Sequence, residues 1–177
     1  MVTAPDSGFG GDWSLLVLRA IGFLVLFALL QFGWQSLHGT SAEYVVIHDF
    51  TVRPAAAIVN SLTPSVGVRS VGFSLEAPGG GLNIENGCEG LEAFFLLFAA
   101  FIVSPMRGRY RLGGLALGMV LVFAVNELRI VALFYAARAD RALFDPLHAD
   151  VAPVLVVLIL CAYFYAWLDF ATHRAAA

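Results

Sequence analysis

The sequence predicts an all-α polytopic membrane protein with about four transmembrane helices, an outer interfacial helix and a small β-hairpin. Of its 177 residues, 60% are hydrophobic and only 13% are charged, whereas soluble domains contain about 45–50% and about 25%. The mean hydropathy is +0.83, and the apolar residues form runs close to the roughly 20 residues that cross a bilayer. We therefore expect a single integral membrane domain over residues 1–177.

The composition excludes several classes of function. A soluble enzyme does not fit the hydropathy, and a nucleic-acid binder does not fit a net charge of −3 without a basic stripe. Two cysteines are too few for the disulfide scaffold of a small secreted protein. The histidines lack the spacing of metal ligands, so we expect neither a metal nor another cofactor.

Four apolar runs have approximately the length of a membrane span. We read the first as a retained anchor, because the residues before it include Asp6 and Asp12 but no basic residue. The second is the shortest, and its outer boundary is the least defined by the sequence. The four expected spans are residues 15–34, 90–106, 112–137 and 151–170.

Three arginines between the second and third runs set the expected orientation. Arg107, Arg109 and Arg111 belong in the cytoplasm by the positive-inside rule. Both termini are then cytoplasmic, and residues 35–87 and 138–150 lie on the outer side.

Residues 38–87 are expected to form an extracytoplasmic insertion that contains a helix. The stretch 42–62 is apolar, but it contains Asp49 and Arg53, and charges at a helix centre cost about 2.5–3.5 kcal/mol each on insertion. We therefore predict a helix that lies in the interface plane and bends at Pro54. Its apolar stripe comprises Tyr44, Ile47, Thr51, Ala55, Ile58 and Leu62.

A hairpin is expected to follow this helix. Val71, Phe73 and Leu75 alternate with small residues, and Leu82 and Ile84 resume the alternation after the turn-forming residues 77–81.

Three side chains with reactive chemistry are expected at similar depth, near the outer ends of three different spans. Cys88 lies at the start of the second span and His148 at the start of the fourth. Arg129 lies roughly 26 Å from the inner end of the third, at about 1.5 Å per residue. A cysteine at a helix N-terminus beside a guanidinium has its thiolate form favoured. Arg129 could stabilise an oxyanion, and His148 could supply a proton to a leaving amine.

Structural interpretations of the same residues stay open. Cys88 could be a small packing residue, His148 a solvated interface residue, and Arg129 the ion-pair partner of a carboxylate. The candidate carboxylates are Glu89, Glu92 and Glu127. Cys161 should lie about 20 Å deeper than His148, too far for a disulfide with Cys88.

Several residues around the candidate triad are expected to support it. Glu85, Asn86 and Asn126 could orient the reactive groups, although Asn86 could equally cap the second span. Gly90 would let the backbone approach closely beside Cys88. The charges of Glu89 and Glu92 would oppose formation of a thiolate.

The motifs resemble those of the exosortase and archaeosortase family of multi-pass membrane cysteine transpeptidases. The sequence N-G-C-E-G-L-E at 86–92, N-E-L-R-I at 126–130 and His148 before the last span follow the family order of Cys, Arg and His. The resemblance covers roughly residues 66–170, and the compact length and the run at 78–92 are similar to the short exosortase H subtype. Glu89 stands where the family commonly has a small residue, and Ala152 and Pro153 stand where a glycine often follows the histidine.

The resemblance implies a membrane cysteine protease and transpeptidase in the bacterial cytoplasmic (inner) membrane, with its active site on the extracytoplasmic face. Cys88 would be the nucleophile, His148 the general acid and base, and Arg129 the stabiliser of thiolate and oxyanion. The substrates would be exported proteins with a C-terminal tripartite sorting signal, transferred through a thioester to an acceptor nucleophile. Two alternatives remain: a non-catalytic membrane assembly or scaffold protein, and a hydrolytic protease without transfer.

Overall fold

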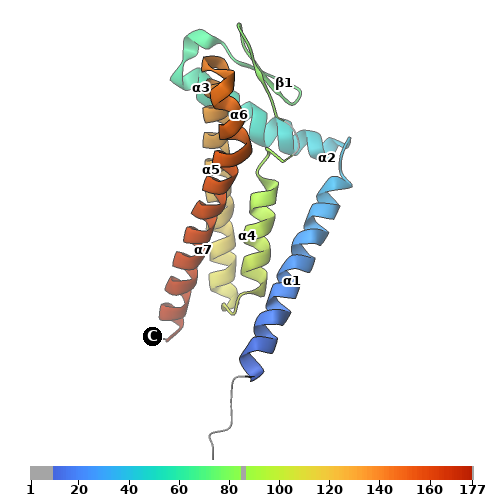
Figure 1. Cartoon of the computed structure of the whole chain (residues 1–177), viewed down its shortest axis with the longest axis vertical. Helices are drawn as coiled ribbons and strands as arrows, with labels where there is room; N and C mark the ends of the chain where they lie inside the picture. The colour runs from blue at the N-terminus through green and yellow to red at the C-terminus, as the bar shows by residue number, and fades with distance from the viewer. Residues whose placement is uncertain (1–9, 85–86, 177) are drawn as a thin grey trace, which may run out of the picture.

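The fold is a bundle of long helices with a small mixed cap at one end (Figure 1). The computed structural model describes residues 10–84 and 87–176. The bundle consists of α1 (Gly10–Gln35), α4 (Leu91–Val103), α5 (Gly108–Ala139) and α7 (Ala152–Ala176). The apolar surfaces of these helices identify a membrane-associated, largely helical protein.

Three helical stretches in the described part of the chain are long and apolar enough to cross a bilayer. They are Trp13–Gln35, Gly108–Ala139 and Arg141–Arg174. The second expected span, 90–106, contains only the 13-residue helix α4, about 20 Å long. Helix α4 is short because Gly90, with φ of 84°, precedes it and Pro105 follows its end.

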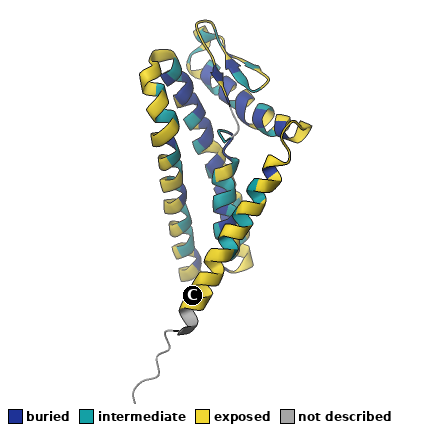
Figure 2. Cartoon of the chain, turned by 45° about the vertical axis from the view of Figure 1, so that its right-hand side comes forward, coloured by how far each residue is buried: buried dark blue, intermediate teal, exposed yellow. Residues whose placement is uncertain are grey.

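Helix α4 lies at the centre of the bundle and packs against α1, α5 and α7. Two glycines of α5 allow the close approach. Gly118 lies against Leu97 of α4, and Gly114 lies between Phe101 of α4 and Trp167 of α7. The indole of Trp167 donates a hydrogen bond of 2.9 Å to the carbonyl of Tyr110, which joins α7 to the start of α5. Figure 2 shows that much of the surface of α1 and α7 is exposed.

A second helical stretch crosses the end of the bundle. It comprises α2 (Ser41–Tyr44), the wider π-type turns η1 (Val45–Val52) and α3 (Arg53–Leu62), followed by the short turn η2 (Pro64–Val66). Its buried face includes Ile47, Val52 and Val59, which pack in one core with Ile130 and Phe134 of α5.

The packing of this face differs from the expected apolar stripe in the interface plane. Ile47, Thr51 and Ala55 are buried within the protein, whereas Tyr44 and Leu62 are exposed. Pro54 lies in the first turn of α3, directly after the π-type turns of η1.

Three short antiparallel strands cover this stretch, in the order β1-β2-β3. They are β1 (Arg69–Val71), β2 (Ser74–Glu76) and β3 (Leu82–Asn83), and Leu75 pairs with Leu82. The expected strand over 71–75 is divided because Gly72 has φ of 55° and reverses the chain. Arg138 Nη1 donates to the carbonyls of Pro78 and Gly80 at 3.0 and 2.9 Å, so the loop between β2 and β3 is fixed to the end of α5.

The chain then reaches α7 through two short elements. Helix α6 (Arg141–Pro146) begins at Asp140, whose side chain accepts a hydrogen bond from the backbone N–H of Ala142. The π-type segment η3 (Leu147–Val151) leads directly into α7. The start of the last helical stretch therefore lies near the cap.

We predict that Gly114→Ala destabilises the bundle by about 1–3 kcal/mol, because a methyl group there overpacks a filled space. Its Cβ would lie 2.5 Å from the indole nitrogen of Trp167. Gly108→Ala is the matched control, because its Cβ would meet nothing within 4 Å. Thermal unfolding of the detergent-solubilised protein measures both effects, and equal midpoints for the two variants would contradict the close packing.

Candidate functional site

The loop that carries Cys88 lies between β3 and α4 and is in direct contact with α5. Gly87 and Gly90 have φ of 93° and 84°, a backbone conformation that residues with a side chain rarely adopt. Gly90 is buried, and a Cβ at this position would lie 2.8 Å from Cγ of Asn126. A glycine at position 90 therefore allows the loop to reach the surface of α5.

This contact brings Cys88 next to Arg129. Arg129 lies three residues after Asn126 on α5, so the two side chains occupy neighbouring positions on one helix face. The Nη2 of Arg129 lies 3.9 Å from Sγ of Cys88 in hydrogen-bonding geometry, and both residues are partly buried. A positive charge at this distance favours a thiolate over a thiol.

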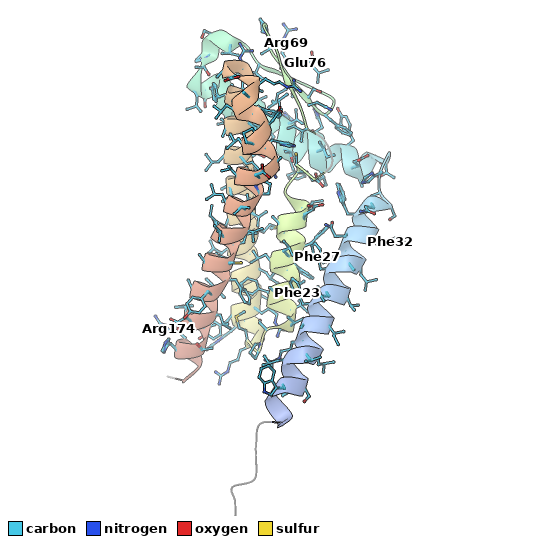
Figure 3. All side chains as sticks on the ribbon, viewed as in Figure 1. Phe23, Phe27, Phe32, Arg69, Glu76 and Arg174 are labelled. Atoms are coloured by element: carbon cyan, nitrogen blue, oxygen red, sulfur yellow. The ribbon has the colours of Figure 1, made fainter. Side chains whose placement is uncertain are left out.

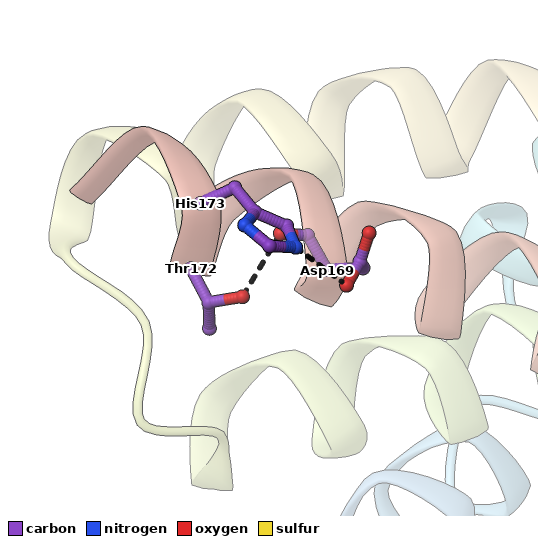
Figure 4. Close-up of polar contacts among 3 residues, drawn as sticks. All are labelled: Asp169, Thr172 and His173. Atoms are coloured by element: carbon purple, nitrogen blue, oxygen red, sulfur yellow. Dashed lines mark hydrogen bonds and ion pairs between the residues drawn. The ribbon is translucent and has the colours of Figure 1, made fainter. Parts of the chain in front are cut away.

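Arg129 forms no ion pair with a carboxylate in the parts of the chain that the structure describes. Among the described residues, the ion pair observed joins His173 Nε2 and Asp169 Oδ1, which are 3.3 Å apart (Figure 4). It lies near the C-terminal end of α7, far along the helix from the cap. Glu127 is 3% exposed, and both of its carboxylate oxygens lack a hydrogen-bond partner among the described residues. Pairing of Arg129 with Glu89, Glu92 or Glu127, which the sequence left open, is therefore not observed.

The carboxylate of Glu89 binds two donors. Its Oε1 accepts a hydrogen bond of 2.7 Å from the indole nitrogen of Trp34, and its Oε2 accepts one of 2.6 Å from the backbone N–H of Gly87. Trp34 and Glu89 are 8% and 7% exposed. Glu89 thus joins the end of α1 to the loop that carries Cys88, and both of its carboxylate oxygens accept a hydrogen bond.

Sequence reasoning did not identify Trp34 as a residue of the site. The available signal was a tryptophan at the end of an apolar span, a position that is equally typical of an interfacial anchor. Its pairing with an acid 55 residues away depends on the crossing of α1 and α4.

A cavity of about 150 Å³ lies beside this loop, where α4, α5 and α7 meet. Its polar side is formed by predicted site residues, and its apolar side by residues of all three helices. The polar side chains are those of Glu92, Asn126 and Arg129, and Gly90 lies beside them. From α7, Pro153, Val156 and Val157 complete the wall. A peptide group placed here would lie against the guanidinium.

Of the three expected reactive residues, Arg129 lines this cavity, whereas Cys88 and His148 do not. His148 lies apart from the loop in sequence. It lies in η3, where its ring stacks on Phe144 with centroids 5.3 Å apart. Its Nδ1 is buried and accepts or donates no hydrogen bond among the described residues. Pro153, five residues further along the same helical stretch, does line the cavity.

Two predicted supporting residues, Glu85 and Asn86, lie outside the described residues. Within the described ranges, no group of three His, Cys, Asp or Glu side chains is arranged to hold a metal ion.

Comparison with known proteins gives no match to this chain from a family model, a curated protein or a solved structure.

We predict that Trp34→Phe lowers the stability of the solubilised protein by about 1.5–3 kcal/mol, because a buried carboxylate loses a donor. Trp13→Phe makes the same change on an exposed residue of the same helix and should have little effect. Thermal unfolding compares the two variants. If Trp34→Phe matches Trp13→Phe, the hydrogen bond to Glu89 does not hold α1 to the loop.

Proposed function

We propose that the protein is a membrane cysteine transpeptidase that cleaves a C-terminal tripartite sorting signal from exported proteins. The observation that carries the proposal is the contact between Arg129 and Cys88 beside a cavity where three helices meet. An arginine with no carboxylate partner among the described residues has its charge available to a thiolate or an oxyanion. A purely structural arginine in an apolar bundle would be expected to pair with one of the nearby acids.

The proposed reaction has two halves, the formation of a thioester on Cys88 and its transfer to an acceptor. The Cys88 thiolate attacks the scissile carbonyl and forms a carbon–sulfur bond, and Arg129 stabilises the oxyanion. His148 gives a proton to the leaving amine as the carbon–nitrogen bond breaks, which leaves a thioester on Cys88. His148 then removes a proton from the acceptor amine, which attacks the thioester and releases Cys88.

The sidedness of this reaction is also part of the proposal. We place Cys88 at the outer face of a bacterial cytoplasmic membrane, with α4 as a fourth crossing in a multi-pass protein. Arg107, Arg109 and Arg111 follow α4 at the end opposite to Cys88, which supports a cytoplasmic position for that end. Because α4 is short, Cys88 would lie within the outer boundary of the bilayer, where a membrane-anchored substrate can reach it.

The test is the intact mass of an exported reporter that carries such a signal from the same genome, coexpressed with this protein. We expect a shortened or adducted reporter with the wild type and an unprocessed reporter with Cys88→Ala, because the thioester needs the thiol. Ser61→Ala is the control, since Ser61 is an exposed residue of α3 in the cap and lines no part of the site. The added mass identifies the acceptor as an amine or as water.

Processing that persists in Cys88→Ala would contradict the proposed chemistry. An unprocessed reporter in cells that contain the wild-type protein would instead favour the assembly or scaffold interpretation of the same fold.

A further inference from the structure

An apolar groove extends along α4 from the candidate site to the other end of the bundle. The cavity beside Arg129 shares Leu96 and Val157 with a second cavity of about 170 Å³. The second shares Phe23, Ala100 and Phe164 with a third of about 440 Å³. The three cavities therefore follow one another along α4, and together they are called the groove here.

The walls of the groove are α1 and α7, and its floor is α4, which stands between them (Figure 1). Helix α1 packs mainly on α4, and the apolar part of α1 is unburied along its length. Figure 3 shows Phe23 on the side of α1 that faces α4, whereas Phe32 points away. The groove is thus open to an occupant from the membrane.

Small residues in the groove suit a helix as its occupant. Ala20 of α1 and Ala100 of α4 both line it, and small residues are typical of close contacts between membrane helices. The groove follows the whole of α4, about 20 Å. An occupying helix could therefore bury more than half of its membrane-crossing length, which is about 30 Å.

Polar groups lie at both ends of the groove. Asn126 and Arg129 are at one end, and Arg19 and Ser104 are at the other. An apolar segment with polar residues at each end matches this distribution. An acyl chain could fill the apolar middle, but it has no peptide group to present to Cys88.

We propose that this groove binds the hydrophobic helix of the substrate, between α1 and α7 and against α4. The inference rests on the proposed function, because the occupant is the segment that follows the scissile bond. Binding there fixes the depth of the substrate in the membrane, so the peptide bond just outside the helix lies at the end of the groove where Arg129 meets Cys88. Fixing a reactant in this way makes attack effectively intramolecular.

Disulfide crosslinking tests the location, because Cys161 lines the groove and is exposed. In Cys88→Ala it is the one remaining cysteine of the chain. Single cysteines are introduced along the hydrophobic helix of the same reporter, and the membranes are oxidised with copper phenanthroline. We expect crosslinks to Cys161 that recur every three to four reporter positions. The matched control combines Cys88→Ala and Cys161→Ser with Ala162→Cys, an exposed position about 100° around α7 that does not line the groove. Its crosslinks should fall to background.

A second measurement tests the groove without a crosslink. Ala100→Trp fills the floor of the groove and should cause loss of reporter processing, whereas Leu117→Trp, at an exposed position of α5 outside the groove, should not.

Crosslinks that are absent at Cys161, or equal at positions 161 and 162, overturn the proposal and leave lipid as the occupant. Processing that is unchanged in Ala100→Trp overturns it as well. Failure of the proposed function is recognised from reporter processing by the wild type and by Cys88→Ala, independently of the crosslinks. The proposed function is contradicted if both proteins process the reporter, or if neither protein does.

Discussion

The close approach of Gly90 to Asn126 is the contact on which the candidate site depends. With no Cβ at position 90, the loop lies directly on α5, and the next turn of that helix presents Arg129 to Cys88. A side chain at this position would have to displace Asn126 and adopt a left-handed backbone conformation. Separation by even a few ångströms would remove Cys88 from the guanidinium, since charge interactions weaken with distance.

Two other parts of the fold hold this loop in place from opposite directions. From α1, the indole of Trp34 binds Glu89, which in turn accepts the N–H of Gly87. From the cap, the core around Ile47, Leu75 and Ile130 includes Cys88 among its partly buried neighbours. The loop that carries Cys88 therefore makes hydrogen bonds toward α1 and apolar contacts with the cap. These contacts limit the positions that Cys88 can adopt.

Much of the architecture could be predicted because hydropathy and helix length are local properties of the sequence. The apolar run at 112–137 becomes the long helix α5, and its residues Asn126 and Arg129 share a face because they are three apart. The run at 90–106 was expected to be the shortest of the four, and its helix α4 has 13 residues between Gly90 and Pro105. The stripe containing Ile47 was assigned to the interface plane, whereas that face packs on α5.

The candidate site was predictable in its members and not in its contacts. Cys88 and Arg129 were expected at similar depth, but depth says nothing about rotation around each helix, which decides what two side chains touch. The partner of Glu89 could not be predicted, because the sequence does not show which donor lies next to which carboxylate. The packing of α1 against α4 places Trp34 beside Glu89. For His148, the sequence gives a position at the start of the last helical stretch, and the structure adds its stacking on Phe144.

The alkylation rate of Cys88 at neutral pH tests the central claim most directly, which is that Arg129 activates this thiol. The rate is compared between the protein with Arg129 and the Arg129→Gln variant, both in a Cys161→Ser background. Arg109→Gln is the control, because it removes the same charge from an exposed residue at the other end of α5. Our account predicts a fall of about tenfold for Arg129→Gln, equivalent to about 1.4 kcal/mol of lost charge stabilisation, partial retention in Arg129→Lys, and little change for Arg109→Gln. Equal rates with arginine and glutamine at position 129 would contradict it.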